Sequence, residues 1–292
     1  MQLEQHYHFQ SHTSIDENLT RQIRELELTM LNHDQFETEL YLAENLNFDR
    51  LLPWVFTIHE NSRLIAVLQL FIPTRTEIEL MGFTHPDYRS RGLFRSLQTY
   101  ALNVWKNHKI PSLLYLVNGK SRSGEDFAVR QNGYYEFTEY FMKWVQPEPF
   151  SIPVNGRLTM RSAQGEDLDL LTDLNHETFG LALEDAKTFS KASIESEQRY
   201  TFLFDVNKEA VGMGSIAIEN ELISIYGVGI LPAHQGKGLG KELMYLLLEK
   251  AQTLPAKQIS LEVNSENFRA FQLYKQLGFE VTYSTDYFRK TL

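Results

Sequence analysis

The chain has no cysteine among its 292 residues. This absence excludes disulfides, a thiolate nucleophile and any zinc or iron–sulfur centre that needs cysteine ligands, and it suits a reducing cytoplasm. The chain also lacks an apolar run of about 18 residues, the length that a membrane-spanning helix needs. Its start, MQLEQHYHFQ, carries no basic segment followed by an apolar one. We therefore expect a cytoplasmic protein with no membrane partner.

Basic residues are the scarcer charged type, with 28 Lys and Arg against 38 Asp and Glu and a net charge of −10. An acidic surface repels nucleic acid and attracts amines and cationic peptides. Nine histidines are present, and only His6, His8 and His12 cluster, without a carboxylate at ligand spacing. The sequence predicts no nucleic-acid partner and no metal site, and it leaves a monomer or a homodimer equally open.

Proline is rare except at the middle of the chain, where residues 145–157 contain Pro147, Pro149 and Pro153 followed by Gly156. Proline at that density removes backbone donors and favours extended conformations. We predict a linker over residues 147–157, between a first domain at 1–146 and a second at 158–292.

The two halves repeat one pattern. Adding 146 converts four residues of the first half into identical or similar ones of the second: Pro86, Arg89, Gly92 and Asn118 become Pro232, Gln235, Gly238 and Asn264. An offset of half the chain length indicates duplication of a whole domain.

Each half gives the same order of predicted elements. In the second half we expect a helix capped by Asp167 and a hairpin turning at Asn207-Lys208. Strands are predicted at 158–162, 201–206, 210–218, 222–230 and 259–263, with later helices at 241–254 and 267–277. Hairpins combined with a later crossover indicate an α/β fold, with an α+β mixed sheet in each half.

The glycine-rich turn from Gln235 to Gly240 lies between an apolar strand and a long helix. Glycines let the backbone approach a ligand, and a helix N-terminus favours an anion, so this turn is typical of a phosphate site. Its spacing differs from the dinucleotide-binding fingerprint, and no Lys-Ser/Thr pair follows the glycines as in a phosphate-binding NTPase loop.

Two motifs resemble the GCN5-related N-acetyltransferase (GNAT) superfamily. Gln235, Gly238 and Gly240 match its Gln/Arg-x-x-Gly-x-Gly/Ala element, and residues 267–279 resemble its Asn-x-x-Ala-x-x-x-Tyr-x-x-x-Gly-Phe element. The first half carries a weaker version, from Arg89 through Gly92 to Phe94, with Phe94 at the place of Gly240. The chain is identified as a member with two tandem GNAT-like acyl-CoA N-acyltransferase domains.

The resemblance implies a fold in which the fourth and fifth strands splay apart around the pantetheine arm of acetyl-CoA, the co-substrate. Gly227 and Gly229 agree with this, because glycine within a strand often marks a bulge or a close approach. The main chain at Val228–Ile230 would hold pantetheine, turn amides would hold the pyrophosphate, and Asn267 would lie near the pantetheine arm. The implied cofactor-binding set is Val228, Gly229, Ile230, Gln235, Gly236, Lys237, Gly238, Leu239, Gly240, Lys241 and Asn267.

Tyr274 lies where this family places its usual general acid, and a phenol stays protonated at neutral pH. Alternatively it packs with Phe271 and Leu277 on one helix face. Glu262, in a Leu-Glu-Val stretch, is the candidate general base, because a carboxylate on a buried strand needs water or a partner. It could equally be a solvent-facing or salt-bridged residue.

Glu219 and Glu221 are reserve bases at the turn entering the fourth strand. In the first half, counting back from Gly133 puts Val129 at the place of Tyr274 and Arg122 at the place of Asn267. Val129 cannot donate a proton, so we expect that half to be degenerate and non-catalytic, although weak CoA binding there stays open.

Two classes of function remain. The first is an N-acetyltransferase acting by direct attack of a primary amine, of a small molecule or a peptide, on acetyl-CoA. The second is a non-catalytic acyl-CoA-binding regulatory protein, which would have no need of an acid at Tyr274. Aminoacyl transfer of the peptidoglycan-bridge type ranks third, because those two-domain enzymes lack the Gln-x-x-Gly-x-Gly turn. The sequence does not identify the acceptor.

Overall fold

The computed structural model describes residues 6–37, 39–42, 45, 47–145, 156–219, 221–255 and 258–292. Of the predicted linker, only Gly156 and Arg157 fall within these ranges, so its three prolines lie outside the described residues. The chain forms two compact units. One comprises residues 1–138 with 283–292, and the other residues 139–282.

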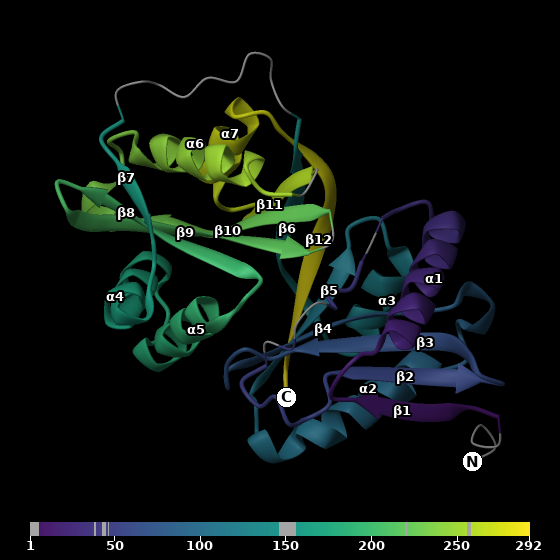
Figure 1. Cartoon of the computed structure of the whole chain (residues 1–292). Helices are drawn as coiled ribbons and strands as arrows, with labels where there is room; N and C mark the ends of the chain where they lie inside the picture. Colours follow the sequence, from purple (N-terminus) through teal and green to yellow (C-terminus); the bar gives the residue numbers. More distant parts are fainter. Residues whose placement is uncertain are drawn as a thin grey trace. The chain divides into compact units, whose positions relative to one another are not determined.

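The first unit is a mixed sheet with helices on both faces (Figure 1). Its strand order is β1-β2-β3-β4-β5-β12. Helices α2 and α3 pack on one face and α1 on the other. The elements are β1 (His8–His12), α1 (Glu17–Asp34), β2 (Val55–Glu60), β3 (Arg63–Phe71), β4 (Glu77–Thr84), α2 (Leu93–Trp105), β5 (Ser112–Asn118) and α3 (Arg122–Arg130).

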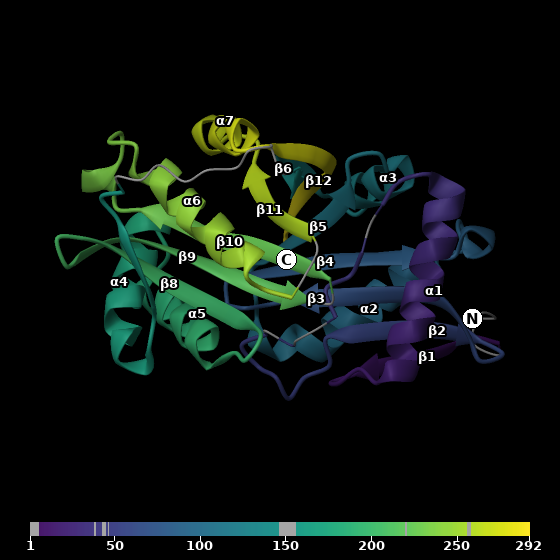
Figure 2. The same ribbon diagram turned by 45° about the horizontal axis from the view of Figure 1, so that its top comes forward.

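The second unit repeats this plan with strand order β6-β11-β10-β9-β8-β7. Helices α6 and α7 cover one face and α4 packs on the other (Figures 1 and 2). The elements are β7 (Thr159–Ser162), α4 (Leu168–Phe179), α5 (Leu183–Glu195), β8 (Arg199–Val206), β9 (Glu209–Glu219), β10 (Leu222–Ile230), α6 (Leu239–Gln252), β11 (Gln258–Asn264) and α7 (Phe268–Gln276). The mixed α/β fold is therefore confirmed.

The last strand of each half of the sequence pairs with a strand from the other half. Residues 139–143 of β6 (Tyr134–Trp144) pair antiparallel with β11, and residues 285–291 of β12 (Phe279–Thr291) pair antiparallel with β5. The compact units thus differ from a division of the chain at the prolines. Both strands are long enough to leave one unit and enter the next, so the boundary falls inside each strand.

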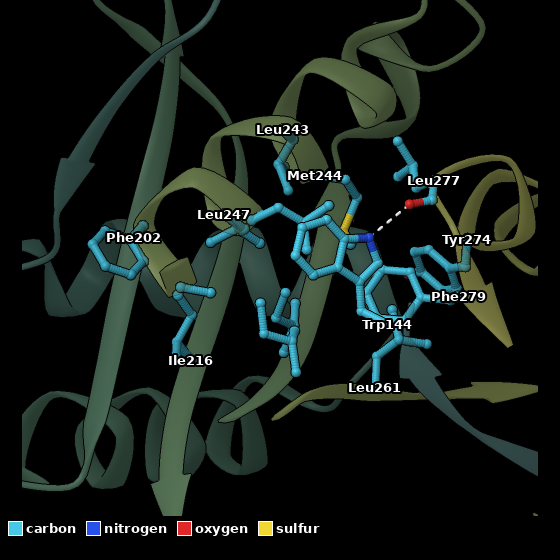
Figure 3. Packing of buried hydrophobic residues seen from close by; sticks show 14 of the residues in the cluster. Trp144, Phe202, Ile216, Leu243, Met244, Leu247, Leu261, Tyr274, Leu277 and Phe279 are labelled. Carbon is cyan, nitrogen blue, oxygen red and sulfur yellow. Dashed lines mark hydrogen bonds between the residues drawn. The ribbon is translucent and has the colours of Figure 1, made fainter. Parts of the chain in front are cut away.

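Trp144 shows how β6 contributes to the second core. It is buried, and its indole Nε1 donates a 2.7 Å hydrogen bond to the carbonyl of Leu277 (Figure 3). Tyr274, Phe279 and Leu261 belong to the same cluster. Burial of an indole stabilises a core only when its N–H finds an acceptor, and this one does.

Two local predictions can be compared directly with the structure. The hairpin at Asn207-Lys208 is confirmed, with both residues at positive φ as a two-residue turn requires. Asp167 stands at the N-cap of α4, but its side chain does not cap the helix. Its carboxylate instead pairs with Arg161 at 2.9 Å, and this hydrogen bond lowers the pKa of Asp167.

No helix in the described part of the chain is both long and apolar enough to span a membrane.

Candidate active site

Strands β10 and β11 run parallel and then separate. Their pairing extends from Leu222 opposite Gln258 to Ile225 opposite Leu261. Beyond it, β10 has an irregularity between Tyr226 and Gly229. Gly227 lies there at φ +59°, a conformation that favours glycine. The splayed strands implied by the family resemblance are thus present.

A cavity of about 160 Å³ opens where the two strands separate. Side chains and backbone from α4, β10, β11 and α7 line it, together with Asn267 at the start of α7. The lining residues are Phe179, Ile225, Tyr226, Gly227, Val228, Glu262, Val263, Asn264, Asn267 and Tyr274. The structure therefore brings both predicted catalytic residues and two predicted cofactor-binding residues to one cavity.

Gly229 and Ile230 are the other strand positions expected beside pantetheine. A Cβ at Gly229 would overlap the side chain of Thr178 at the end of α4, so this glycine is required by close helix–strand packing. The Ile230 side chain is buried in the core, and its carbonyl accepts a 2.9 Å hydrogen bond from Nε2 of Gln235. Gln235 thereby ties the glycine turn to the end of β10.

The glycine turn has the backbone form that anion binding needs. Gly236 and Gly238 have φ values of +74° and +80°, and α6 begins at Leu239 with no side-chain cap. The first-turn amides of an uncapped helix lack partners inside the helix and favour an anion. Gly240 and Lys241 lie in this first turn, where the amide of Lys241 also donates to the carbonyl of Gly238 at 3.2 Å. The turn therefore fits a pyrophosphate group.

Arg157 braces the same turn, and sequence reasoning missed it. Its Nη2 donates to the carbonyl of Lys237 at 2.7 Å, while its backbone N–H and Nε donate to Glu242 at 2.8 and 2.9 Å. Burial opposes the charge of Glu242, but the bonds from Arg157 outweigh it and hold the pKa of that carboxyl below its usual value. No sequence signal marks an arginine at the end of the predicted linker as a partner of a turn 80 residues away.

Tyr274 combines the two roles weighed from the sequence. Only 8% of it is exposed, and its ring meets Phe279 edge-on at 6.0 Å. It also lines the cavity. Burial raises the pKa of its hydroxyl to about 12, so the phenol keeps its proton throughout the neutral range.

Glu262 points from β11 into the cavity, where water can still reach its side chain. The surrounding strands and α7 nevertheless crowd its carboxylate and weaken the hydration of the charge. This desolvation, followed by repulsion from Glu139, raises the pKa of Glu262 to about 7. A carboxylate with that pKa can accept and release a proton near neutral pH.

The remaining predicted residues have separate places. Asn267 caps α7, its Oδ1 accepting from the amide of Ala270 at 3.2 Å. Glu221 precedes the first residue of β10, at the opposite end of that strand from the cavity. The side chain of Glu219 lies outside what the structure describes. Among the described residues, no group of three or more His, Asp or Glu side chains is placed to hold a metal ion.

The turn of the first half keeps the backbone form of the second. Arg89 (φ −66°, ψ 165°) matches Gln235 (φ −68°, ψ 164°), and its Nε donates to the carbonyl of Thr84, as Gln235 donates to Ile230. Ser90 and Gly92 have φ values of +61° and +76°.

Phe94 stands after that turn at the position that corresponds to Gly240. Its ring packs edge-on against Phe127 at 5.0 Å. It also lies so close to Gly82 that a Cβ there would be 2.9 Å from Cε2 of Phe94. By the offset of 146, Gly82 and Phe127 correspond to Val228 and Leu273.

The helix caps correct the alignment of the two candidate catalytic helices. Ser121 caps α3 as Asn267 caps α7, which sets their offset at 146. The counterpart of Tyr274 is therefore the buried Ala128, and the sequence-based assignments of Val129 and Arg122 were wrong by one residue. The counterpart of Glu262 is Leu116, on β5. Neither Ala128 nor Leu116 can transfer a proton.

Comparisons with known proteins agree with this architecture. The profile described as "Acetyltransferase (GNAT) family" matches residues 168–279. A mycothiol acetyltransferase of Amycolatopsis mediterranei (strain U-32) is 26% identical over 68% of this chain and 70% of its own. An uncharacterized N-acetyltransferase of Escherichia coli (strain K12) is 37% identical over 25% of this chain and 46% of its own.

Solved structures show the same fold over the whole chain. A GCN5-related N-acetyltransferase from Sphaerobacter thermophilus superposes with a TM-score of 0.77 at 15% identity, covering 99% of this chain and 96% of that one. A tandem GNAT protein from the clavulanic acid biosynthesis pathway gives 0.71 at 15% identity, covering 98% of both chains.

The same fold is present twice in the chain, and the GNAT family model matches its second half over residues 168–279. The likeness to a tandem GNAT protein over the whole chain is a likeness of fold. The chain's match to some curated relatives is partial: with the mycothiol acetyltransferase of Mycobacterium sp. (strain MCS), 26% identical, the match spans 46% of this chain and 49% of that one.

Proposed function

We propose that the second half is an acetyl-CoA-dependent N-acetyltransferase that acts on a primary amine of a small molecule or peptide. One observation carries this proposal: Glu262 and Tyr274 line a single cavity at the point where β10 and β11 separate. The cavity holds a proton acceptor and a proton donor whose pKa values, about 7 and about 12, suit those roles at neutral pH.

The co-substrate would lie between the splayed strands. The glycine turn and the start of α6 would bind its pyrophosphate through backbone amides. Val228 and Asn267 line the cavity where the thioester end of the pantetheine arm would arrive. Arg157 acts indirectly, because its hydrogen bonds hold the turn in shape.

Direct attack requires two proton transfers. The acceptor amine loses a proton to Glu262 and its nitrogen forms a bond to the thioester carbonyl carbon. As the carbon–sulfur bond breaks, the departing thiolate takes the proton of Tyr274. The products are the N-acetylated amine and free CoA, and solvent returns both residues to their starting protonation states.

The acceptor class is inferred from the relatives and the charge of the cavity. The relatives' names specify small molecules, namely mycothiol and L-methionine sulfoximine or sulfone. Glu262 lines the cavity and Glu139 acts on it by charge repulsion, and a pair of carboxylates suits an amine acceptor. The first half, with Ala128 and Leu116 at the two critical positions, would serve as a non-catalytic partner domain.

Two measurements test the proposal. A thermal-shift titration with acetyl-CoA should raise the melting temperature of the full chain in proportion to occupancy. A thiol-release assay with amino sugars, polyamines, L-methionine sulfoximine and a peptide with a free N-terminus should then identify a turned-over amine. Binding without turnover of any amine would favour the regulatory alternative, and the absence of binding would reject both.

A further inference from the structure

Glu139 lies on β6, the strand supplied by the first half of the sequence, and no motif singled it out. The register of β6 and β11 places Glu139 opposite Asn264 and Phe141 opposite Glu262. Side chains alternate along a strand, and Met142 is fully buried in the core with Tyr140 packed beside it. Glu139 and Glu262 therefore share the opposite face of the sheet, as diagonal neighbours.

Diagonal neighbours on antiparallel strands are about 7–8 Å apart, within range of a strong charge interaction when the space between them is poorly solvated. After desolvation, repulsion from Glu139 is the one charge effect among the described residues that raises the pKa of Glu262. The other titratable groups facing the cavity are the phenols of Tyr226 and Tyr274, both neutral because burial raises their pKa values. Lys143, opposite Ser260, is the basic group on the same face of β6.

The first half offers an internal comparison. Its β12 pairs with β5 as β6 pairs with β11, with Thr285 opposite Asn118 and Tyr287 opposite Leu116. At the offset of 146, Thr285 and Leu116 take the places of Glu139 and Glu262. The two carboxylates are thus present together in the unit that has the cavity and the tyrosine, and absent together from the unit that lacks the tyrosine.

We propose that Glu139 is an acceptor-recognition and positioning residue of the second unit. Together with Glu262 it would select an acceptor that carries a protonated amine without a neighbouring carboxylate. This inference rests on the proposed function. The amine arrives as an ammonium ion between two negative charges, gives one proton to Glu262, and attacks as the neutral amine. The second proton, lost from nitrogen as the amide forms, returns through solvent to the Tyr274 phenolate that protonation of the thiolate leaves behind. The negative charge of Glu139 favours the cation before the transfer and, by repelling the charge of Glu262, makes Glu262 a stronger base.

The first test measures the two carboxylates without any acceptor. Titration of ¹³C-glutamate-labelled full-length protein, with the Glu262 signal assigned by its loss in Glu262→Gln, gives the pKa of Glu262 directly. In Glu139→Gln the pKa of Glu262 should fall by about half a unit to one unit. In Glu139→Asp, which keeps a negative charge at this position, the pKa of Glu262 should stay close to its wild-type value. Glu280→Gln is the matched control, because it removes the same charge from an exposed position on β12.

The second test uses the amine that the thiol-release panel identifies. Glu139→Gln should raise its KM about 5- to 10-fold and move the acidic limb of the pH profile to lower pH, with a smaller effect on kcat. An unchanged titration of Glu262 in Glu139→Gln would overturn the inference, even if acetyl transfer is confirmed. Conversely, a shifted titration in a chain that acetylates nothing would support the charge coupling and reject the proposed function.

Discussion

The surroundings of Tyr274 and Glu262 raise the pKa values of both side chains. Burial raises the pKa of Tyr274 to about 12, so it keeps its proton at neutral pH, whereas Glu262, with a pKa of about 7, loses its proton in the neutral range. Groups with separated pKa values in one cavity are the usual arrangement for an acid and a base. The fold thus sets both pKa values in the absence of any substrate.

Removing the hydroxyl of Tyr274 tests the acid. Tyr274→Phe keeps the ring that packs against Phe279, so the protein should unfold at nearly the wild-type temperature. Turnover should fall about 10²-fold, with the acetyl-CoA dissociation constant nearly unchanged, because only the proton donor is lost. Steady-state kinetics and calorimetry measure the two quantities, and equal turnover in the two proteins would leave Tyr274 a packing residue.

The pH dependence of kcat/KM tests the base. Glu262 must be deprotonated to accept a proton, so kcat/KM should fall about tenfold per pH unit below the pKa of about 7. Glu262→Gln should abolish this acidic limb and lower kcat/KM at pH 8. A profile with the same limb in the variant would assign the limb to another group.

The same variant should change stability with a defined sign. In the unfolded chain Glu262 releases its proton near pH 4.5, but in the folded protein it does so near 7. Between these values the native state binds more protons, so stability falls as pH rises through this window. Glu262→Gln removes that dependence and should raise the melting temperature relative to wild type more at pH 8 than at pH 4. Equal differences at both pH values would contradict the desolvation of Glu262.

At the scale of single elements, the duplicated turn provides a matched pair of positions. Gly238 and Gly92 both precede a helix, at φ values of +80° and +76°. Phe94, packed against Phe127 and close to Gly82, stands where the second turn has Gly240. The two turns therefore share a backbone form but differ in the side chain that follows it.

Aspartate substitutions separate backbone strain from ligand binding at this pair. Gly238→Asp should weaken acetyl-CoA binding more than about 100-fold, because a carboxylate would occupy the pyrophosphate site. Gly92→Asp imposes a similar positive-φ strain and should leave turnover within a few-fold of wild type. Calorimetry and kinetics on both folded variants decide the assignment. Loss of acetylation in Gly92→Asp alone would place the active site in the first half.

At the scale of the whole molecule, the exchange of β6 and β12 means that neither unit is continuous with one half of the sequence. Cutting at the linker removes β6 from the second unit. That deletion would take Met142 and Trp144 out of the core and leave β11 without its antiparallel partner. Exposed strand edges and an incomplete core favour aggregation.

Two fragments test this dependence. A fragment of residues 158–292 should be aggregated or lack a cooperative thermal transition, whereas residues 139–282 should unfold cooperatively, because they contain the complete second unit. Circular dichroism melts and gel filtration compare them. If 158–292 folds and binds acetyl-CoA like the full chain, β6 is dispensable and the exchange has little energetic weight.

The sequence by itself determined the features that depend on short segments. The duplication, the mixed fold, the Gln235–Gly240 turn and the helix carrying Tyr274 were all predictable, because local spacing and backbone preference specify them. The alignment of α3 with α7 was predicted one residue out, because the sequence comparison matched Gly133 with Gly278. In the structure the residue with positive φ after α3 is Asn132, which is therefore the counterpart of Gly278.

Only the tertiary structure decided which distant segments meet. The strand 134–144 is apolar enough to pair with several neighbours, and nothing in its pattern specifies β11 as the partner of residues 139–143. The same holds for Arg157 and Lys237, whose hydrogen bond spans 80 residues. Glu139 beside Glu262 follows from the strand register alone. Pairing between strands depends on the packing of the complete sheets, and this information is not contained in any single segment.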